Sequence, residues 1–139
     1  MSNLPIKLQR QVHFYETDAM KVVHHTNYLR YFEEGRVAWG FDRGIISLTP
    51  GADITHLAVL DIRARYLKPL IFADKFEITV QAKLERLRLT FQYRLIRDGV
   101  VTTVGESVHV PLGEDLKLKP WNETVKNIFR SEAWTETWL

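Results

Sequence analysis

The residues best suited to chemistry lie between Tyr15 and Tyr28, in the run YETDAMKVVHHTNY. A carboxylate, Asp18, is followed there by the start of a helical pattern. The first backbone N–H groups of a helix have no partner within it and favour negative charge. This combination suits acyl transfer or hydrolysis, with Asp18 as nucleophile or general base and the N–H groups binding an oxyanion. The same spacing also fits an aspartate that only caps a turn.

Other residue types narrow the range of chemistry. The chain has no cysteine, which excludes disulfides, thiolate metal sites and a cysteine nucleophile. Its five histidines form no HExxH pattern, and the adjacent pair His24–His25 is a poor metal site by itself. Walker, GxGxxG and GxSxG motifs do not occur. We therefore expect neither a metal nor a bound cofactor.

Length and charge limit the possible partners. The 139 residues fit one domain. The 19 Lys and Arg nearly balance the 17 Asp and Glu, giving a net charge of +2, which argues against a nucleic-acid-binding protein. No segment approaches the ~20 apolar residues of a membrane span, and the N-terminal residues do not resemble a signal peptide. We expect a cytoplasmic protein without a membrane span.

One long helix is predicted from Thr26 or Asn27, either of which is a suitable N-cap. Gly40 or Gly44 can end it. Helical spacing places four residues on one face, which we expect to be buried: Tyr28, Phe32, Gly35 and Trp39.

Strands account for most of the remaining chain. A first strand is predicted over Gln9–Thr17, and Ser47–Thr55 is typical of a loop. Strict alternation then predicts strands with one buried and one solvent-facing side. Asp98–Gly99 is a strong hairpin signal. The short links favour an antiparallel sheet whose apolar face is covered by the helix, an α+β arrangement. The alternating strands are Leu60–Tyr66, Phe76–Glu85, Leu87–Leu95 and Val100–Val110.

The C-terminal region has two parts. Trp121–Phe129 fits a short helix with Asn122 as its cap. The tail that follows carries Trp134 and Trp138, large apolar side chains that we expect to cover an edge or an interface.

The run from Val12 to Trp39, VHFYETDAMKVVHHTNYLRYFEEGRVAW, resembles the signature of hotdog-fold acyl-CoA thioesterases. The family is the 4-hydroxybenzoyl-CoA thioesterase type, including its Tol–Pal-associated bacterial branch. Tyr66–Leu70, followed by Asp74, is also similar, and the resemblance extends to about Pro111. It implies a hotdog fold, in which a mainly antiparallel sheet of about five strands wraps one long helix. Residues 1–139 would form a single domain with a short extension from about residue 120.

The resemblance also implies an activity. Members of the family hydrolyse an acyl-CoA thioester to a carboxylic acid and coenzyme A, which is part of the substrate. They need no other cofactor and form homodimers or homotetramers with the site between subunits. Two alternatives stay open: a thioesterase acting on acyl-carrier proteins, and a non-catalytic module that binds acyl-CoA.

Position by position, Asp18 matches the catalytic aspartate of the family, and His25 lies where a backbone N–H approaches the thioester carbonyl. Phe14 matches an aromatic position that is often tyrosine, although Tyr15 is adjacent. The substrate-binding residues implied by the resemblance are Tyr15, Val23, Asn27, Tyr28, Arg86 and Arg88.

Two departures from the family pattern stand out. Lys21 replaces a glycine, which would allow positive φ. Either the loop follows a different path, or the lysine is tolerated and its charge lowers the pKa of Asp18. The segment Arg86–Arg88 replaces small residues and could reshape the substrate channel or contact phosphates.

Overall fold

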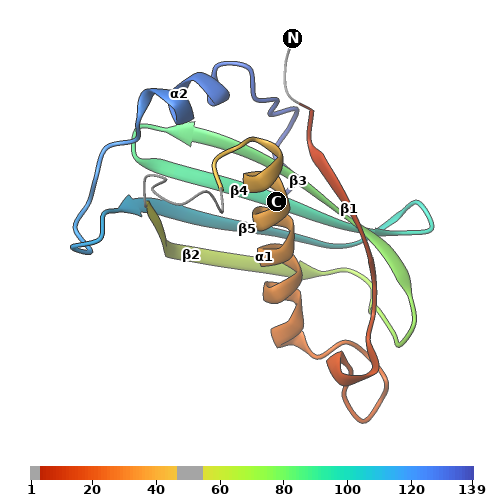
Figure 1. The fold of residues 1–139 in the computed structure, drawn as a ribbon. Coiled ribbons are helices and arrows are strands. Elements are labelled where there is room, and N and C mark those ends of the chain that lie inside the picture. Colours follow the sequence, from red (N-terminus) through yellow and green to blue (C-terminus); the bar gives the residue numbers. More distant parts are fainter. Residues whose placement is uncertain (1–3, 47–54) are drawn as a thin grey trace.

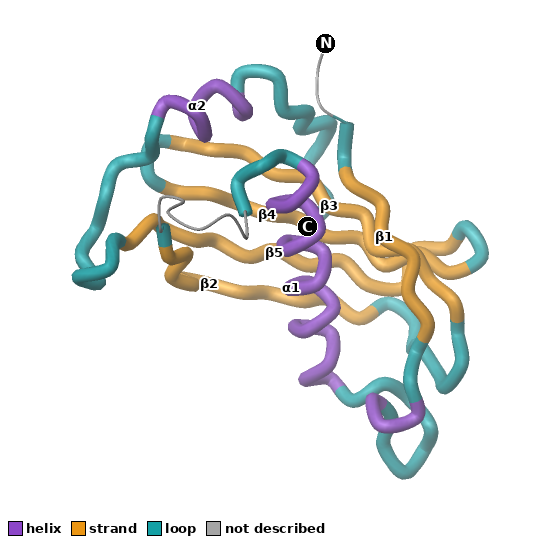
Figure 2. The backbone as a smooth tube through the Cα atoms, viewed as in Figure 1, coloured by secondary structure: helices purple, strands orange, loops and turns teal. Residues whose placement is uncertain are grey.

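The computed structural model describes residues 4–46 and 55–139 and contains one five-stranded antiparallel sheet with a long helix across one face (Figures 1 and 2). The strand order is β1-β3-β4-β5-β2, which confirms the predicted α+β class. The elements in chain order are β1 (Ile6–Gln11), the 3-10 turn η1 (Phe14–Glu16), α1 (His25–Asp42), β2 (His56–Tyr66), β3 (Lys75–Glu85), β4 (Arg88–Arg97), β5 (Val100–Leu112) and α2 (Glu123–Phe129).

The first strand differs from its prediction, because it ends at Gln11 and a 3-10 turn follows at Phe14–Glu16. The predicted strand over Gln9–Thr17 was therefore wrong from Val12 onward. The Glu16 carboxylate accepts the His13 backbone N–H at 2.8 Å. Such a local bond offers the backbone an alternative to a strand ladder, and it turns the chain before the loop that carries Asp18.

Helix α1 begins at His25, one or two residues earlier than predicted. His24 is its N-cap, with Nδ1 accepting the Thr26 N–H at 3.3 Å, so the N-cap predictions of Thr26 and Asn27 were wrong. A histidine can cap in this way because its unprotonated ring nitrogen is an acceptor. The helix passes through Gly40 and ends at Asp42, and Gly44 follows with φ 76°.

The predicted face of α1 is confirmed, since all four of its residues are buried against the sheet. Phe32 stacks on Tyr93 of β4, with ring centroids 4.5 Å apart. Two glycines make this close packing possible. A Cβ at Gly35 would lie 2.7 Å from Val80 Cγ2, and one at Gly105 would lie 2.3 Å from Phe32 Cζ. The core therefore lies between α1 and the central strands.

The opposite face of β3 and β4 is not solvent-facing, contrary to its prediction. Gln81 and Gln92 are fully buried there. Segment 131–139, which we call the C-terminal tail, covers them: Gln81 Nε2 donates to Glu136 O at 2.6 Å, and Trp138 N donates to Gln92 Oε1 at 2.8 Å. The tail thus covers a sheet face. Sequence periodicity missed this because glutamines pattern as surface residues.

Strand β2 is an edge strand, and its predicted buried side is only partly covered. Ile62 and Ala64 are half-buried, whereas Leu60 and Tyr66 are 53% and 49% exposed. The reason is position: β2 pairs only with β5, while α1 packs on β1, β3 and β4. Alternation identified the strand but not its place at the edge.

Two local predictions are confirmed. Asp98 and Gly99 link β4 to β5 with φ of 50° and 75°, as a tight hairpin requires. Asn122 caps α2 by accepting the Val125 N–H at 2.9 Å. The predicted loop Ser47–Thr55 lies, apart from Thr55, outside the described residues.

Candidate active site

The loop that carries Asp18 folds back beside the residues that lead into α1. Thr17 forms a β-bridge with Val23, and the Asp18 N–H donates to Val22 O at 2.9 Å. The His24 N–H donates to Glu16 O at the same distance. These bonds hold the Asp18 segment of the loop against the residues that lead into α1.

One oxygen of Asp18 has a structural role. Its Oδ1 accepts the Met20 N–H at 2.8 Å, which caps the turn at the tip of the loop. Within the described residues, Oδ2 forms no hydrogen bond. The capping interpretation and the chemical one are therefore compatible, because one oxygen orients the carboxylate and the other is available to a water molecule.

Lys21 adopts the left-handed conformation that glycine adopts easily, with φ 62°. Its backbone joins the loop on both sides: its N–H donates to Asp18 O at 2.9 Å and its carbonyl accepts the Phe72 N–H at 3.1 Å. The backbone of Lys21 is thus in the region of φ that the expected glycine would allow. No ion pair joins Lys21 to Asp18 in the described part of the chain.

The start of α1 leaves one N–H group unpaired. His24 accepts the Thr26 N–H with its side chain and the Asn27 N–H with its carbonyl, at 3.3 and 2.9 Å. The first N–H of the helix, that of His25, has no acceptor among residues 4–46 and 55–139. Such a group, at the positive end of an 18-residue helix, is suited to bind an oxyanion.

A pocket of about 290 Å³ lies at this helix start. The Tyr28 hydroxyl accepts the Leu70 N–H at 3.4 Å, and burial raises the pKa of Tyr28, which keeps its hydroxyl protonated. Tyr66 packs against Tyr28 with ring centroids 4.8 Å apart. The pocket walls therefore combine residues before and inside α1 with the end of β2: Val22, Val23, His25, Tyr28, Tyr66, Leu67, Lys68 and Pro69.

The remaining predicted substrate-binding residues lie outside this pocket. Asn27 is buried and its amide donates to Glu16 O at 2.8 Å. Tyr15 is 77% exposed and stacks on His13. Arg86 and Arg88 lie at the β3–β4 hairpin, at the opposite end of β3 from the pocket, about 33 Å along the strand. Within one chain the structure does not bring these two arginines to the helix start, and their phosphate contacts stay a prediction.

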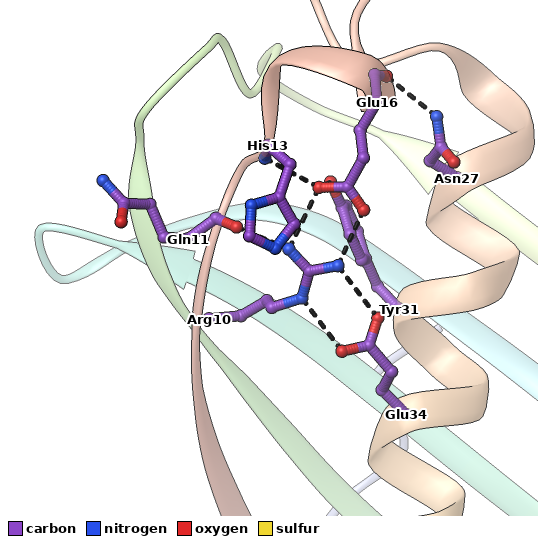
Figure 3. A network of polar contacts seen from close by, with 7 residues as sticks. All are labelled: Arg10, Gln11, His13, Glu16, Asn27, Tyr31 and Glu34. Atoms are coloured by element: carbon purple, nitrogen blue, oxygen red, sulfur yellow. Dashed lines mark hydrogen bonds and ion pairs between the residues drawn. The ribbon is translucent and has the colours of Figure 1, made fainter.

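Sequence reasoning missed two groups of residues at this site. The first is the pocket wall from Tyr66 to Pro69, which the family resemblance included without assigning it a place. The second is a buried polar network around Glu16, with Arg10, Tyr31 and Glu34 (Figure 3). The spacing of Arg10 and Glu16 was visible, but nothing local reveals that both side chains turn inward.

No three His, Cys, Asp or Glu side chains gather into a metal site in residues 4–46 and 55–139. Over the same ranges, no helix is long and apolar enough to span a membrane.

An antiparallel sheet wrapped around a long central helix, with a pocket at the start of that helix, defines a hotdog-fold protein. A crystal structure of a protein from Aquifex aeolicus superimposes with a TM-score of 0.82 at 30% identity, over 90% of this chain and 99% of the other. A gentisyl-coenzyme A thioesterase has the same fold, with a TM-score of 0.81 at 20% identity over 89% and 99%.

The chain belongs to the thioesterase-like superfamily, whose family model matches residues 12–129. A protein of Aquifex aeolicus provisionally named an esterase is 33% identical over 76% of this chain and 84% of its own length. A 1,4-dihydroxy-2-naphthoyl-CoA hydrolase of Thermosynechococcus vestitus is 30% identical over 71% and 70%. Membership of this superfamily supports thioester hydrolysis as the activity.

Proposed function

We propose that the protein hydrolyses an acyl-CoA thioester to a carboxylic acid and coenzyme A. The observation that carries the proposal is the unpaired His25 N–H at the start of α1, in a pocket beside the loop that presents Asp18. Relatives named as CoA thioester hydrolases add support. The substrate class is drawn from those names and from the superfamily.

In the proposed reaction, the thioester carbonyl oxygen accepts the His25 N–H, which withdraws charge as the tetrahedral intermediate forms. Oδ2 of Asp18 takes a proton from water while the water oxygen bonds to the carbonyl carbon. Collapse of the intermediate breaks the carbon–sulfur bond, and the thiolate of coenzyme A recovers the proton from Asp18. Direct attack by Asp18 uses the same geometry: its oxygen bonds to the carbonyl carbon as the carbon–sulfur bond breaks and the thiolate leaves. Water then cleaves the anhydride, giving the free acid and the Asp18 carboxylate, and its proton goes to the thiolate.

The test is a panel of aliphatic and aromatic acyl-CoAs with detection of the released thiol, run on wild type and Asp18→Asn. We expect kcat of the variant to fall about 10²–10⁴-fold, because the amide can neither take a proton nor act as nucleophile. The Asn side-chain oxygen can still accept the Met20 N–H, so the melting temperature should change little. Unchanged kcat/KM on the best substrate would refute the assignment of Asp18.

Matched acyl-carrier-protein substrates separate the main alternative. If the acyl-carrier-protein thioester is hydrolysed with a higher kcat/KM than the matching CoA thioester, the proposal moves to that substrate class. Acyl-CoA binding by calorimetry with no turnover across the panel would instead indicate a non-catalytic binding module.

A further inference from the structure

Glu16 lies at the centre of a buried network that joins β1, η1 and α1 (Figure 3). Its Oε1 accepts from Arg10 Nη1 at 3.0 Å, from the His13 N–H at 2.8 Å and from the Tyr31 hydroxyl at 3.0 Å, while Oε2 accepts from Arg10 Nη2 at 2.7 Å. The Glu16 side chain is only 4% exposed. Donors from three segments of the chain thus hold one carboxylate.

Arg10 bridges Glu16 to a second carboxylate. Its Nε and Nη2 donate to Glu34 at 2.9 and 3.2 Å, and its guanidinium lies over the Tyr31 ring, 5.0 Å from the centroid. Burial by itself raises the pKa of Glu16, but the bonds from Arg10, His13 and Tyr31 outweigh it and lower that pKa. Burial alone would also lower the pKa of Arg10, which its bonds to Glu34 and Glu16 raise. The pair is therefore charged at neutral pH.

The backbone of Glu16 connects the two parts of the candidate site. Its carbonyl accepts the His24 N–H at 2.9 Å and the Asn27 amide at 2.8 Å. Asp18 follows Glu16 by two residues, and His25 directly follows His24. The segment that carries the carboxylate and the segment that carries the free N–H are therefore both attached at Glu16.

We propose that Glu16, held by Arg10 and Tyr31, is a positioning residue that fixes the Asp18 carboxylate relative to the His25 N–H. The inference rests on the proposed thioester hydrolysis. Its physical basis is that the catalytic rate depends more steeply on the position of reacting groups than stability depends on one buried ion pair. A buried ion pair adds little net stability over well-packed apolar residues, whereas a displacement of about 1 Å between reacting groups can cost about 100-fold in rate.

The chain offers a matched control at the other end of α1. Glu132 accepts from Arg43 Nε at 2.8 Å and from Arg43 Nη2 at 2.9 Å, and also from Trp39 Nε1 at 2.8 Å. Its side chain is 1% exposed. Glu132→Gln therefore disrupts a buried arginine–carboxylate pair with an additional donor, as Glu16→Gln does, but far from Asp18 along the helix.

The experiment compares wild type, Glu16→Gln and Glu132→Gln with the best acyl-CoA substrate, at a temperature where circular dichroism shows all three folded. We expect Glu16→Gln to lower kcat about 30–100-fold with KM changed less than about 3-fold, because the pocket walls are intact. Glu132→Gln should keep kcat within about 2-fold at the same loss of stability. Amide hydrogen exchange at His24, measured without substrate, should accelerate only in Glu16→Gln.

A milder variant covers the case in which Glu16→Gln does not fold. Tyr31→Phe removes a single hydrogen bond to Glu16 and should lower kcat about 3–10-fold at constant KM. If the wild type turns over and the Glu16 and Glu132 variants have equal kcat, this inference alone is overturned. The same holds if Glu16→Gln does not fold and Tyr31→Phe has the kcat of the wild type. Absence of wild-type turnover on every thioester overturns the proposed function and this inference with it, and normal His24 exchange in Glu16→Gln contradicts the positioning role directly.

Discussion

Lys21 shows how a single residue can satisfy a glycine position at an energetic cost. A side chain in the left-handed region costs the folded state about 1–2 kcal/mol, which glycine would avoid. Glycine would in turn lose about 0.5–1 kcal/mol of stability, because its backbone is freer in the unfolded chain. Because the loop bonds of Lys21 are made by its backbone, glycine can keep them all.

We expect Lys21→Gly to raise the free energy of unfolding by about 0.5–1 kcal/mol, measured by urea denaturation. Activity should stay within about 2-fold, because the loop bonds are unchanged. Lys21→Ala is the control, since alanine removes the charge but keeps the strained φ, and its stability should match wild type. Equal stabilisation by both variants would mean that the lysine charge, not its backbone, is unfavourable.

His109 gives the protein a predicted pH response. It is fully buried on β5, where Nε2 contacts Ser107 Oγ at 2.8 Å and Nδ1 has no hydrogen-bond partner among the described residues. Burial, with the nearby charge of Arg36, lowers the pKa of His109 to about 4. In the unfolded chain that pKa is about 6.5. Between pH 6.5 and about 4 the unfolded state therefore binds a proton that the folded state does not.

Stability should accordingly fall as pH drops from about 6.5 to about 4, by up to about 3 kcal/mol, and this contribution should be constant above pH 6.5. Urea unfolding at half-unit pH steps measures the slope. His109→Gln should remove that part of it. Glu16 has a separate effect, because its pKa is lowered in the folded state. The stability that its charge contributes is fully present above the ordinary glutamate pKa and is lost as the pH falls below it. A slope that persists unchanged in His109→Gln would assign the response to another group.

At the scale of elements, the sequence predicted what local signals determine. The buried face of α1, the Asp98–Gly99 hairpin and the Asn122 cap each depend on residues a few positions apart, and all three were predicted correctly. The network at Glu16 and the covered glutamines depend on contacts between distant segments, such as Trp138 with Gln92. Periodicity carries no information about such pairs, so these features appeared only in three dimensions.

The C-terminal tail is an element whose removal has a definite predicted cost. Ending the chain at Arg130 would leave Arg43 and the Trp39 indole without Glu132 and would uncover Gln81 and Gln92. Breaking a buried ion pair from one side costs about 3–5 kcal/mol. We expect the truncated protein to lose at least about 3 kcal/mol of unfolding free energy and to bind a hydrophobic dye more strongly.

A conservative change in the tail provides the comparison. Trp138 Nε1 is buried and has no hydrogen-bond partner within residues 4–46 and 55–139. Trp138→Phe removes that group and keeps an aromatic ring, so its cost should be below about 1.5 kcal/mol. If the truncation lowers the free energy of unfolding no more than Trp138→Phe does, the tail does not pack stably on β3 and β4.

Among the described residues the sheet has two edge strands, β1 and β2, and β2 is the longer, with 11 residues against 6. Strand β2 pairs with β5 on one side only, and its apolar side chains Leu57, Val59 and Leu60 are 40–53% exposed. Tyr66, the last residue of β2, and Leu67, which follows it, line the candidate pocket and are 49% and 53% exposed. An exposed apolar edge of this kind is a template for pairing with another chain. We therefore expect a homodimer through β2, with the pocket at its interface.

The double variant Leu57→Lys, Val59→Lys tests this assembly. Both side chains are exposed in the single chain, so the fold should tolerate the charges, while paired edges would bring like charges together. Light scattering should show a dimer for wild type and a monomer for the variant, with kcat/KM reduced at least about 10-fold because Tyr66 and Leu67 lose their cover. Val100→Lys, at a residue 42% exposed outside β2, is the control and should stay dimeric and active.

A double variant that remains dimeric would place the interface elsewhere. A monomeric variant with full activity would show that one chain already contains the complete site, so these two measurements separate how the protein assembles from what its pocket requires.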